Sequence, residues 1–165
     1  MDKEKNGKIS ALIISVLVFC LALQGVQEWS AVGIYTGCGL GCRFSYPFYH
    51  VGLLHALLNA WSLLSIVFIY RISVVRLVVA YLIAVFIPPL CLSHTPTVGL
   101  SGVVFALFGS ISFEVERKLY YQLWMFLYLA IGFLFPNTNA LVHLYCYAAG
   151  FALALLNKPV KIAHK

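Results

Sequence analysis

Apolar stretches follow one another along almost the whole chain, and several are long enough to cross a lipid bilayer. A hydrocarbon core about 30 Å thick needs roughly 20 helical residues, so 165 residues accommodate about six crossings and no second domain. With 62% hydrophobic and only 10% charged residues, the composition excludes a water-soluble globular domain. We therefore expect an all-α membrane protein with one domain covering residues 1–165, surrounded by the lipid bilayer.

Short polar or charged turns divide the chain into six predicted spans. These cover residues 9–26, 50–70, 73–92, 98–113, 120–135 and 140–156. The first stretch could be a signal peptide, but the following ALQGVQEWS is a poor cleavage site, so we predict a retained span. Pro88 and Pro89 are expected to distort the end of the third span.

The basic residues predict the orientation of the spans. With a cytoplasmic N-terminus, ten of the eleven Lys and Arg residues lie on the inner side and only Arg43 lies outside. Both termini are then cytoplasmic, and the second, fourth and sixth spans run from outside to inside. The net charge of +6 forms no basic run interleaved with aromatic residues, so we expect no nucleic-acid partner.

The five cysteines show no zinc-finger spacing. Cys20, Cys91 and Cys146 lie within apolar stretches, where a small buried hydrophobe is the expected role. Cys38 and Cys42 flank a Gly-Leu-Gly sequence in the loop of residues 27–49, and they are compatible with a local disulfide or with two free thiols.

Polar side chains occur inside three of the predicted spans, at a similar depth. His50, His55 and Asn59 lie near the start of the second span, with Asn59 one turn below His55. Ser101 lies near the start of the fourth span, and His143 near the start of the sixth. All three spans enter from the outer side, so these groups should share one layer in the outer half of the membrane. Ionisable groups at such depth are functional candidates by default.

Ser101 has the setting of a nucleophile. Gly99 and Gly102 flank it and permit a tight backbone at a helix start, where free N–H groups can stabilise an oxyanion. His143 could be a satisfied core histidine or could take the serine proton. All five acidic residues fall outside the spans, so the chemistry would be that of a Ser-His dyad, with Phe105 bracing the imidazole.

His55 and Asn59 have two interpretations. They could join helices by hydrogen bonds, or they could donate to a developing oxyanion. A metal site is a weaker hypothesis, because His50, His55, His94 and His143 lack an accompanying carboxylate and no His-Glu-x-x-His sequence occurs. His94 and His164 are expected at the surface and in the solvated tail.

Three stretches together resemble the rhomboid family of intramembrane serine proteases. The first begins with YPFYH at residue 46 and continues to Asn59, the second is GLSGVVFALFG at 99–109, and the third runs from His143 to Gly150. The resemblance implies Ser101 as nucleophile and His143 as general base. It also implies that His55, Asn59 and the backbone N–H of Ser101 form the oxyanion hole.

The resemblance further implies supporting roles for certain positions and a substrate class. The supporting positions are His50, Gly99, Gly102, Phe105 and Gly150. Substrates would be membrane-spanning helices, cleaved near the outer face without cofactor or metal. The chain departs from the family pattern at Phe105, which is often tyrosine, and in the loop 27–49, which lacks a Trp-Arg pair.

Two other functions are compatible with parts of the pattern. A non-catalytic rhomboid-like protein could bind transmembrane clients, although such proteins typically lack the serine or the histidine. A small transporter could use the histidines as a proton relay, but no inverted repeat is present. The small size and the absence of a transit segment favour a bacterial inner membrane.

Overall fold

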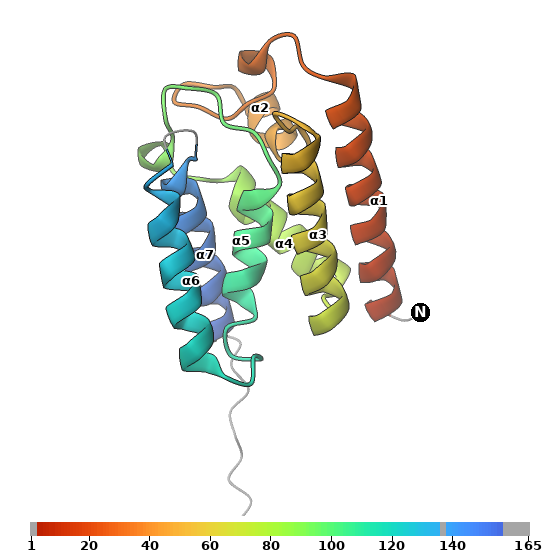
Figure 1. Ribbon diagram of the computed structural model, residues 1–165, viewed down its shortest axis with the longest axis vertical. Coiled ribbons are helices and arrows are strands. Elements are labelled where there is room, and N and C mark those ends of the chain that lie inside the picture. Colours follow the sequence, from red (N-terminus) through yellow and green to blue (C-terminus); the bar gives the residue numbers. More distant parts are fainter. Residues whose placement is uncertain (1–2, 136–137, 157–165) are drawn as a thin grey trace, which may run out of the picture.

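The computed structural model describes residues 3–135 and 138–156, and this part of the chain contains seven α-helices (Figure 1). They are α1 (Lys3–Gln24), α2 (Leu40–Ser45), α3 (Leu53–Tyr70), α4 (Val74–Val85), α5 (Ser101–Ser110), α6 (Lys118–Gly132) and α7 (Ala140–Leu156). Three single-turn 3-10 helices interrupt the loops: η1 (Trp29–Ala31), η2 (Tyr46–Phe48) and η3 (Pro89–Cys91).

An α-helix overlaps each of the six predicted apolar segments, with differences at the ends. Helix α3 begins at Leu53, after an extended Gly52, so His50 lies in the preceding loop and does not open the helix. Helix α4 stops at Val85, well before residue 92, because Pro88 and Pro89 end the hydrogen-bonding pattern and η3 follows. By length and composition, α1 and α3 are long enough to cross a membrane, whereas α4, α5 and α7 are shorter apolar helices.

Helix α5 lies at the centre of the bundle, between α3 and α4 on one side and α6 and α7 on the other (Figure 1). Seven of its ten residues are buried, as expected for a helix that is apolar on all sides. Two glycines bring α5 against α7. A Cβ added at Gly150 would lie 2.0 Å from the carbonyl oxygen of Ala106, and one added at Gly109 would lie 2.1 Å from that of Tyr147. The two backbones are therefore in direct contact.

The loops at the upper end of the bundle in Figure 1, here called the outer loops after the orientation that the sequence predicts, are tied to one another and to the end of α4. Ile34 and Thr97 form an antiparallel bridge, in which the backbone nitrogen of each lies 2.8 and 2.9 Å, respectively, from the carbonyl oxygen of the other. Arg43 donates to the carbonyl of Ile87 at 2.8 Å, and Tyr81 donates to that of Phe44 at 2.7 Å. The short helix α2 was not predicted, and it carries Arg43 to this position.

Cys38 and Cys42 are free thiols in the structure. The Cys42 thiol donates to the carbonyls of Ser30 and Ala31, at 3.5 and 3.3 Å. It thereby links α2 to η1 within the outer loop.

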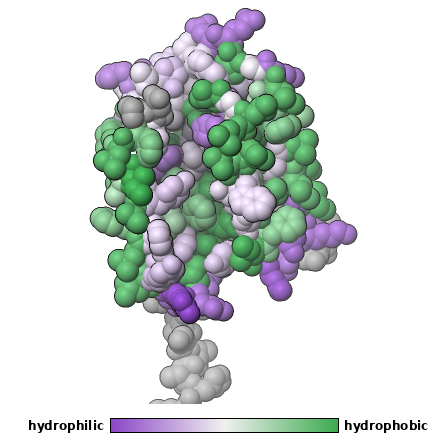
Figure 2. Space-filling model, in the orientation of Figure 1, coloured by the Kyte–Doolittle hydropathy of each residue, from purple (hydrophilic) through white to green (hydrophobic). Residues whose placement is uncertain are grey.

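Large apolar side chains cover the sides of the bundle, and hydrophilic residues gather mainly at its two ends (Figure 2). Leu54, Trp61 and Phe126 are each at least 70% exposed. Ion pairs lie at the end of the bundle where α1 begins, where Glu4 pairs with Lys8 at 2.8 Å and Arg76 pairs with Glu114 at 2.7 Å. A side surface this apolar is suited to lipid rather than to water.

Candidate active site

Ser101 is the first residue of α5, and the turn before it depends on glycine. Gly99 has φ +130°, a conformation that side chains with a Cβ rarely adopt, and a Cβ there would lie 2.9 Å from His55 Cε1. The Gly99 N–H donates to the carbonyl of Tyr46 at 3.0 Å. The N–H groups of the first helical turn have no acceptor within the helix, so that of Ser101 is available to a ligand.

His143 lies in the first turn of α7, opposite Ser101. Its Nε2 atom is 2.8 Å from Ser101 Oγ, which is hydrogen-bonding distance, and both side chains are partly buried. Asn139 caps α7, because its Oδ1 accepts the Val142 N–H at 3.3 Å. The structure therefore brings together the two residues on which the sequence hypothesis depends.

Close helix packing supports this contact from behind. A Cβ added at Gly102 would lie 2.9 Å from Tyr46 Oη and 3.5 Å from Cys146 Sγ. Tyr46 is 1% exposed and donates to the carbonyl of Ala84 at 2.9 Å. Burial raises the pKa of Tyr46 well above its usual range, so its hydroxyl stays protonated.

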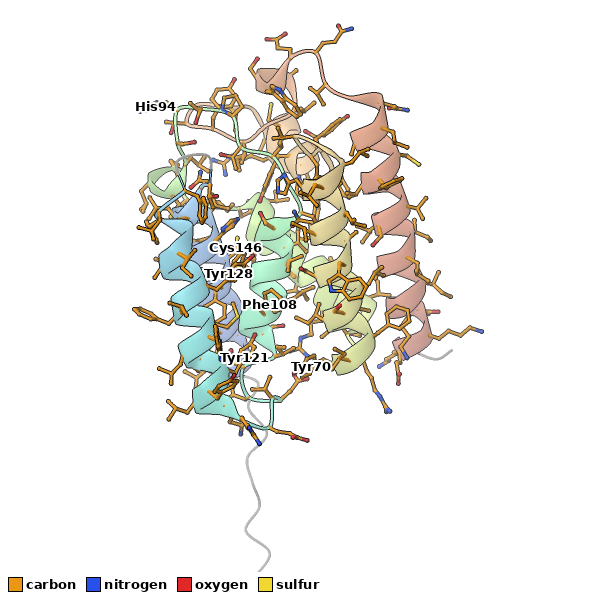
Figure 3. The ribbon with its side chains drawn as sticks, in the orientation of Figure 1. Tyr70, His94, Phe108, Tyr121, Tyr128 and Cys146 are labelled. Atoms are coloured by element: carbon orange, nitrogen blue, oxygen red, sulfur yellow. The ribbon has the colours of Figure 1, made fainter. Side chains whose placement is uncertain are left out.

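Phe105 braces the imidazole. Its ring stacks on that of His143 with centroids 4.4 Å apart and planes inclined by 19°, and on that of Tyr128 at 5.4 Å and 21°. Tyr128 lies on α6 and Cys146 on α7, both near the middle of the bundle (Figure 3). The described residues that line the adjacent cavity include no carboxylate. The imidazole therefore contacts an aromatic ring and the Ser101 hydroxyl, and no described carboxylate lines the cavity beside it.

His55 and Asn59 face the same cavity from α3. Asn59 Nδ2 donates to the carbonyl of His55 at 2.9 Å, and one amide hydrogen remains for another acceptor. The rings of His55 and His50 meet edge to face, with centroids 4.8 Å apart. Both predicted oxyanion donors therefore lie beside Ser101.

His50 supports the turn before Ser101. It is 3% exposed, and its Nε2 accepts the N–H of Leu100 at 3.1 Å, while Nδ1 lies 3.3 Å from the carbonyl of Phe48. Nδ1 therefore carries the proton. Burial, followed by the neighbouring His55, lowers the pKa of His50 to about 4.

The cavity in front of the Ser-His pair has a volume of about 330 Å³. Its lining includes Thr97, Thr138 and Asn139 from the loops before α5 and α7, and Ser62 and Phe108 from within α3 and α5. His94 is exposed on the outer loop, away from Tyr128 and Cys146 (Figure 3). Among the residues that the structure describes, no three His, Cys, Asp or Glu side chains are grouped as a metal site would require.

Comparison with known families identifies the family of the chain. The rhomboid domain family matches residues 42–159, which include every residue of the site. The chain belongs to the rhomboid family. A search among curated proteins finds no match. As a rhomboid, the chain is an α-helical membrane protein.

Three residues of this rhomboid site were not predicted from the sequence. Asn139 precedes an apolar run, and this helix-capping signal could have identified it. Thr97 lies in a loop four residues before Ser101, and no local pattern marks it. Tyr128 is one of several aromatic residues on α6, and only the three-dimensional packing distinguishes it.

Proposed function

We propose that this rhomboid is an intramembrane serine endopeptidase, with Ser101 as nucleophile and His143 as general base. The observation that carries the proposal is the 2.8 Å contact between Ser101 Oγ and His143 Nε2 at the edge of a cavity. A hydroxyl at this distance from a neutral imidazole can be deprotonated as it attacks a carbonyl carbon. No cofactor or metal takes part in this chemistry.

The reaction proceeds in two halves. Ser101 Oγ bonds to the scissile carbonyl carbon as His143 Nε2 takes its proton, and the carbonyl oxygen becomes an oxyanion. The N–H of Ser101, the His55 ring and the Asn59 amide donate to that oxygen. The C–N bond then breaks, and the leaving amine takes the proton from His143. Water, deprotonated by His143, resolves the acyl-enzyme and regenerates Ser101.

The proposed setting is a six-span bundle with both termini in the cytoplasm of a bacterial cell, embedded in the inner membrane. The distribution of Lys and Arg supports this orientation. The cavity lies toward the outer loops, since Thr97 and Asn139 line it. The proposed substrates are transmembrane helices cleaved near the outer face, at small residues in segments that unwind easily and expose a backbone carbonyl.

The test is labelling by a fluorophosphonate, which reacts with activated serines. We expect the purified wild-type protein to be labelled and the Ser101→Ala variant to be unlabelled, with unchanged thermal unfolding. Ser15→Ala is a matched control, because the Ser15 hydroxyl is buried in α1 and donates to the carbonyl of Ala11. Equal labelling of the wild type and Ser101→Ala would refute the proposal.

A cleavage assay separates catalysis from client binding. His143→Ala should abolish cleavage of a transmembrane substrate while leaving the fold intact. A wild type that cleaves nothing, and that binds transmembrane clients as well as Ser101→Ala does, would instead identify a non-catalytic rhomboid. Comparing membrane-protein fragments between wild-type and Ser101→Ala cells would then identify the substrates of an active enzyme.

A further inference from the structure

One side chain connects the segment that carries Ser101 to the helix that carries His143. Asn139 Nδ2 donates to Thr97 Oγ1 at 3.3 Å, and the Asn139 Oδ1 atom accepts the N–H of Val142, also at 3.3 Å. The Asn139 carbonyl accepts the N–H of His143 at 3.3 Å. A single amide thus caps α7 and reaches across to the loop before α5.

Thr97 is a fixed point on that loop. Its backbone N–H and carbonyl both pair with Ile34, at 2.9 and 2.8 Å. Ser101 follows four residues later, after the turn at Gly99, whose φ is +130°. A displacement of Asn139 relative to Thr97 would therefore change the distance between Ser101 Oγ and His143 Nε2.

The inner parts of α5 and α7 are already held together by direct backbone contact at Gly109 and Gly150. The first turns of α7, where His143 lies, contain no glycine that would bring the two backbones into contact. The first turn of a helix also frays readily when its cap is lost. The hydrogen bond between Asn139 and Thr97 adds a point of attachment at the N-terminal end of α7, besides the stacking of Phe105 on His143. His143 lies one turn from it.

We propose that Asn139 and Thr97 form a clasp that holds His143 within reach of Ser101. Asn139 is thereby a positioning residue, acting through the placement of α7. This inference rests on the proposed function, because the distance matters to reaction rate only if Ser101 is the nucleophile. The clasp itself is a property of the fold and can be tested separately.

The first test compares fluorophosphonate labelling rates at saturating probe. Thr97→Val removes the acceptor and keeps the β-branched shape, and we expect it to slow labelling by about fivefold to tenfold. Thr97→Ser keeps the hydroxyl and should restore most of the rate. Thr36→Val is the matched control, because the Thr36 hydroxyl donates only to the nearby loop carbonyls of Leu92 and Ser93. Labelling of Thr97→Val at the wild-type rate would overturn the clasp.

A double-mutant cycle distinguishes a clasp from general damage. Asn139→Ser can still cap α7 but is too short to reach Thr97, so it should slow labelling as much as Thr97→Val does. The double variant should be no slower than either single variant. In a cleavage assay kcat should fall while KM stays constant. Multiplicative losses in the double variant would show that the two residues act independently, contrary to the proposal.

A thiol probe tests the clasp even if the wild type proves inactive. In a Ser101→Cys background, the neighbouring imidazole should accelerate alkylation by iodoacetamide at neutral pH, and His143→Ala should remove that acceleration. Adding Thr97→Val to the Ser101→Cys variant should also slow alkylation, as His143→Ala does. An unlabelled wild type combined with slower alkylation would reject the protease and keep the clasp. Unchanged alkylation would reject the clasp whatever the activity.

Discussion

Phe105 and His143 stack face to face, with ring centroids 4.4 Å apart and planes inclined by only 19°. Phe105 lies one turn after Ser101 on α5, so the helix that presents Ser101 also supports the His143 ring. Tyr128 covers the other face of the Phe105 ring. The imidazole of His143 is therefore held by stacking on Phe105 and by its hydrogen bond with Ser101, and the described residues that line the cavity include no carboxylate.

Removing the aromatic ring should therefore impair catalysis more than folding. We expect Phe105→Leu to lower kcat about tenfold, because the imidazole gains freedom to rotate away from Ser101. Phe105→Tyr keeps the stacking surface and should stay within about threefold of wild type. Steady-state cleavage at a temperature well below unfolding measures both. Equal activity of all three proteins would contradict a bracing role.

The oxyanion donors should affect the rate of the chemical step. Asn59→Ala removes an amide that faces the cavity beside Ser101, and loss of one such donor typically costs about 10²-fold in kcat. Asn59→Asp keeps the size and also lacks the donor, so it should show a similar loss with little change in KM. A rise in KM with an unchanged kcat would instead identify Asn59 as a substrate-binding residue.

The contact between α5 and α7 makes a prediction about stability. Gly150→Ala would place a Cβ 2.0 Å from the carbonyl oxygen of Ala106, and the helices must move apart to accommodate it. Overpacking of this kind costs about 1–3 kcal/mol, so we expect a lower unfolding temperature and slower fluorophosphonate labelling. Gly41→Ala is the control, since nothing lies within 4 Å of its Cβ position. Similar unfolding temperatures for both variants would contradict the close packing.

Much of the site could be predicted because a membrane makes polar residues conspicuous. Ser101, His143 and Asn59 lie in otherwise apolar stretches, and depth arithmetic alone placed them in one layer. Gly99 was marked by its neighbours, and its φ of +130° shows why no other residue serves there. In a soluble protein the same polar residues would not stand out, because polar side chains are common along the whole sequence.

The remaining features depend on loop geometry and on tertiary contacts, which leave no periodic signal. The hydrogen bond between Asn139 and Thr97 joins residues 42 positions apart. Helix α2 forms within a Gly-rich loop whose composition favours turns, and it is stabilised by contacts such as that of Arg43 with Ile87. The early end of α4 at Val85 followed from the two prolines, but hydropathy alone extended the span past it.

The proposed six-span topology predicts which residues face which compartment. His94 is exposed on the outer loops, and Glu116 is exposed between α5 and α6 at the opposite end. In a variant without the native cysteines, His94→Cys should react with a membrane-impermeant maleimide in intact cells. Glu116→Cys should react only after the membrane is permeabilised. Equal reaction of both in intact cells would contradict the proposed orientation.

The acid sensitivity of the fold should trace to His50. Burial, followed by the neighbouring His55, lowers the pKa of His50 from 6.5 to about 4. Protonation would also remove the acceptor of the Leu100 N–H. A lowered folded-state pKa contributes stability that is complete above about pH 6.5 and is lost as the pH falls through 4, with a limit of about 3 kcal/mol. Unfolding temperatures measured in mild detergent should therefore fall between pH 6.5 and 4. His50→Gln keeps an acceptor that does not titrate, so its decline over this range should be shallower, and a parallel decline would assign the acid sensitivity to other groups.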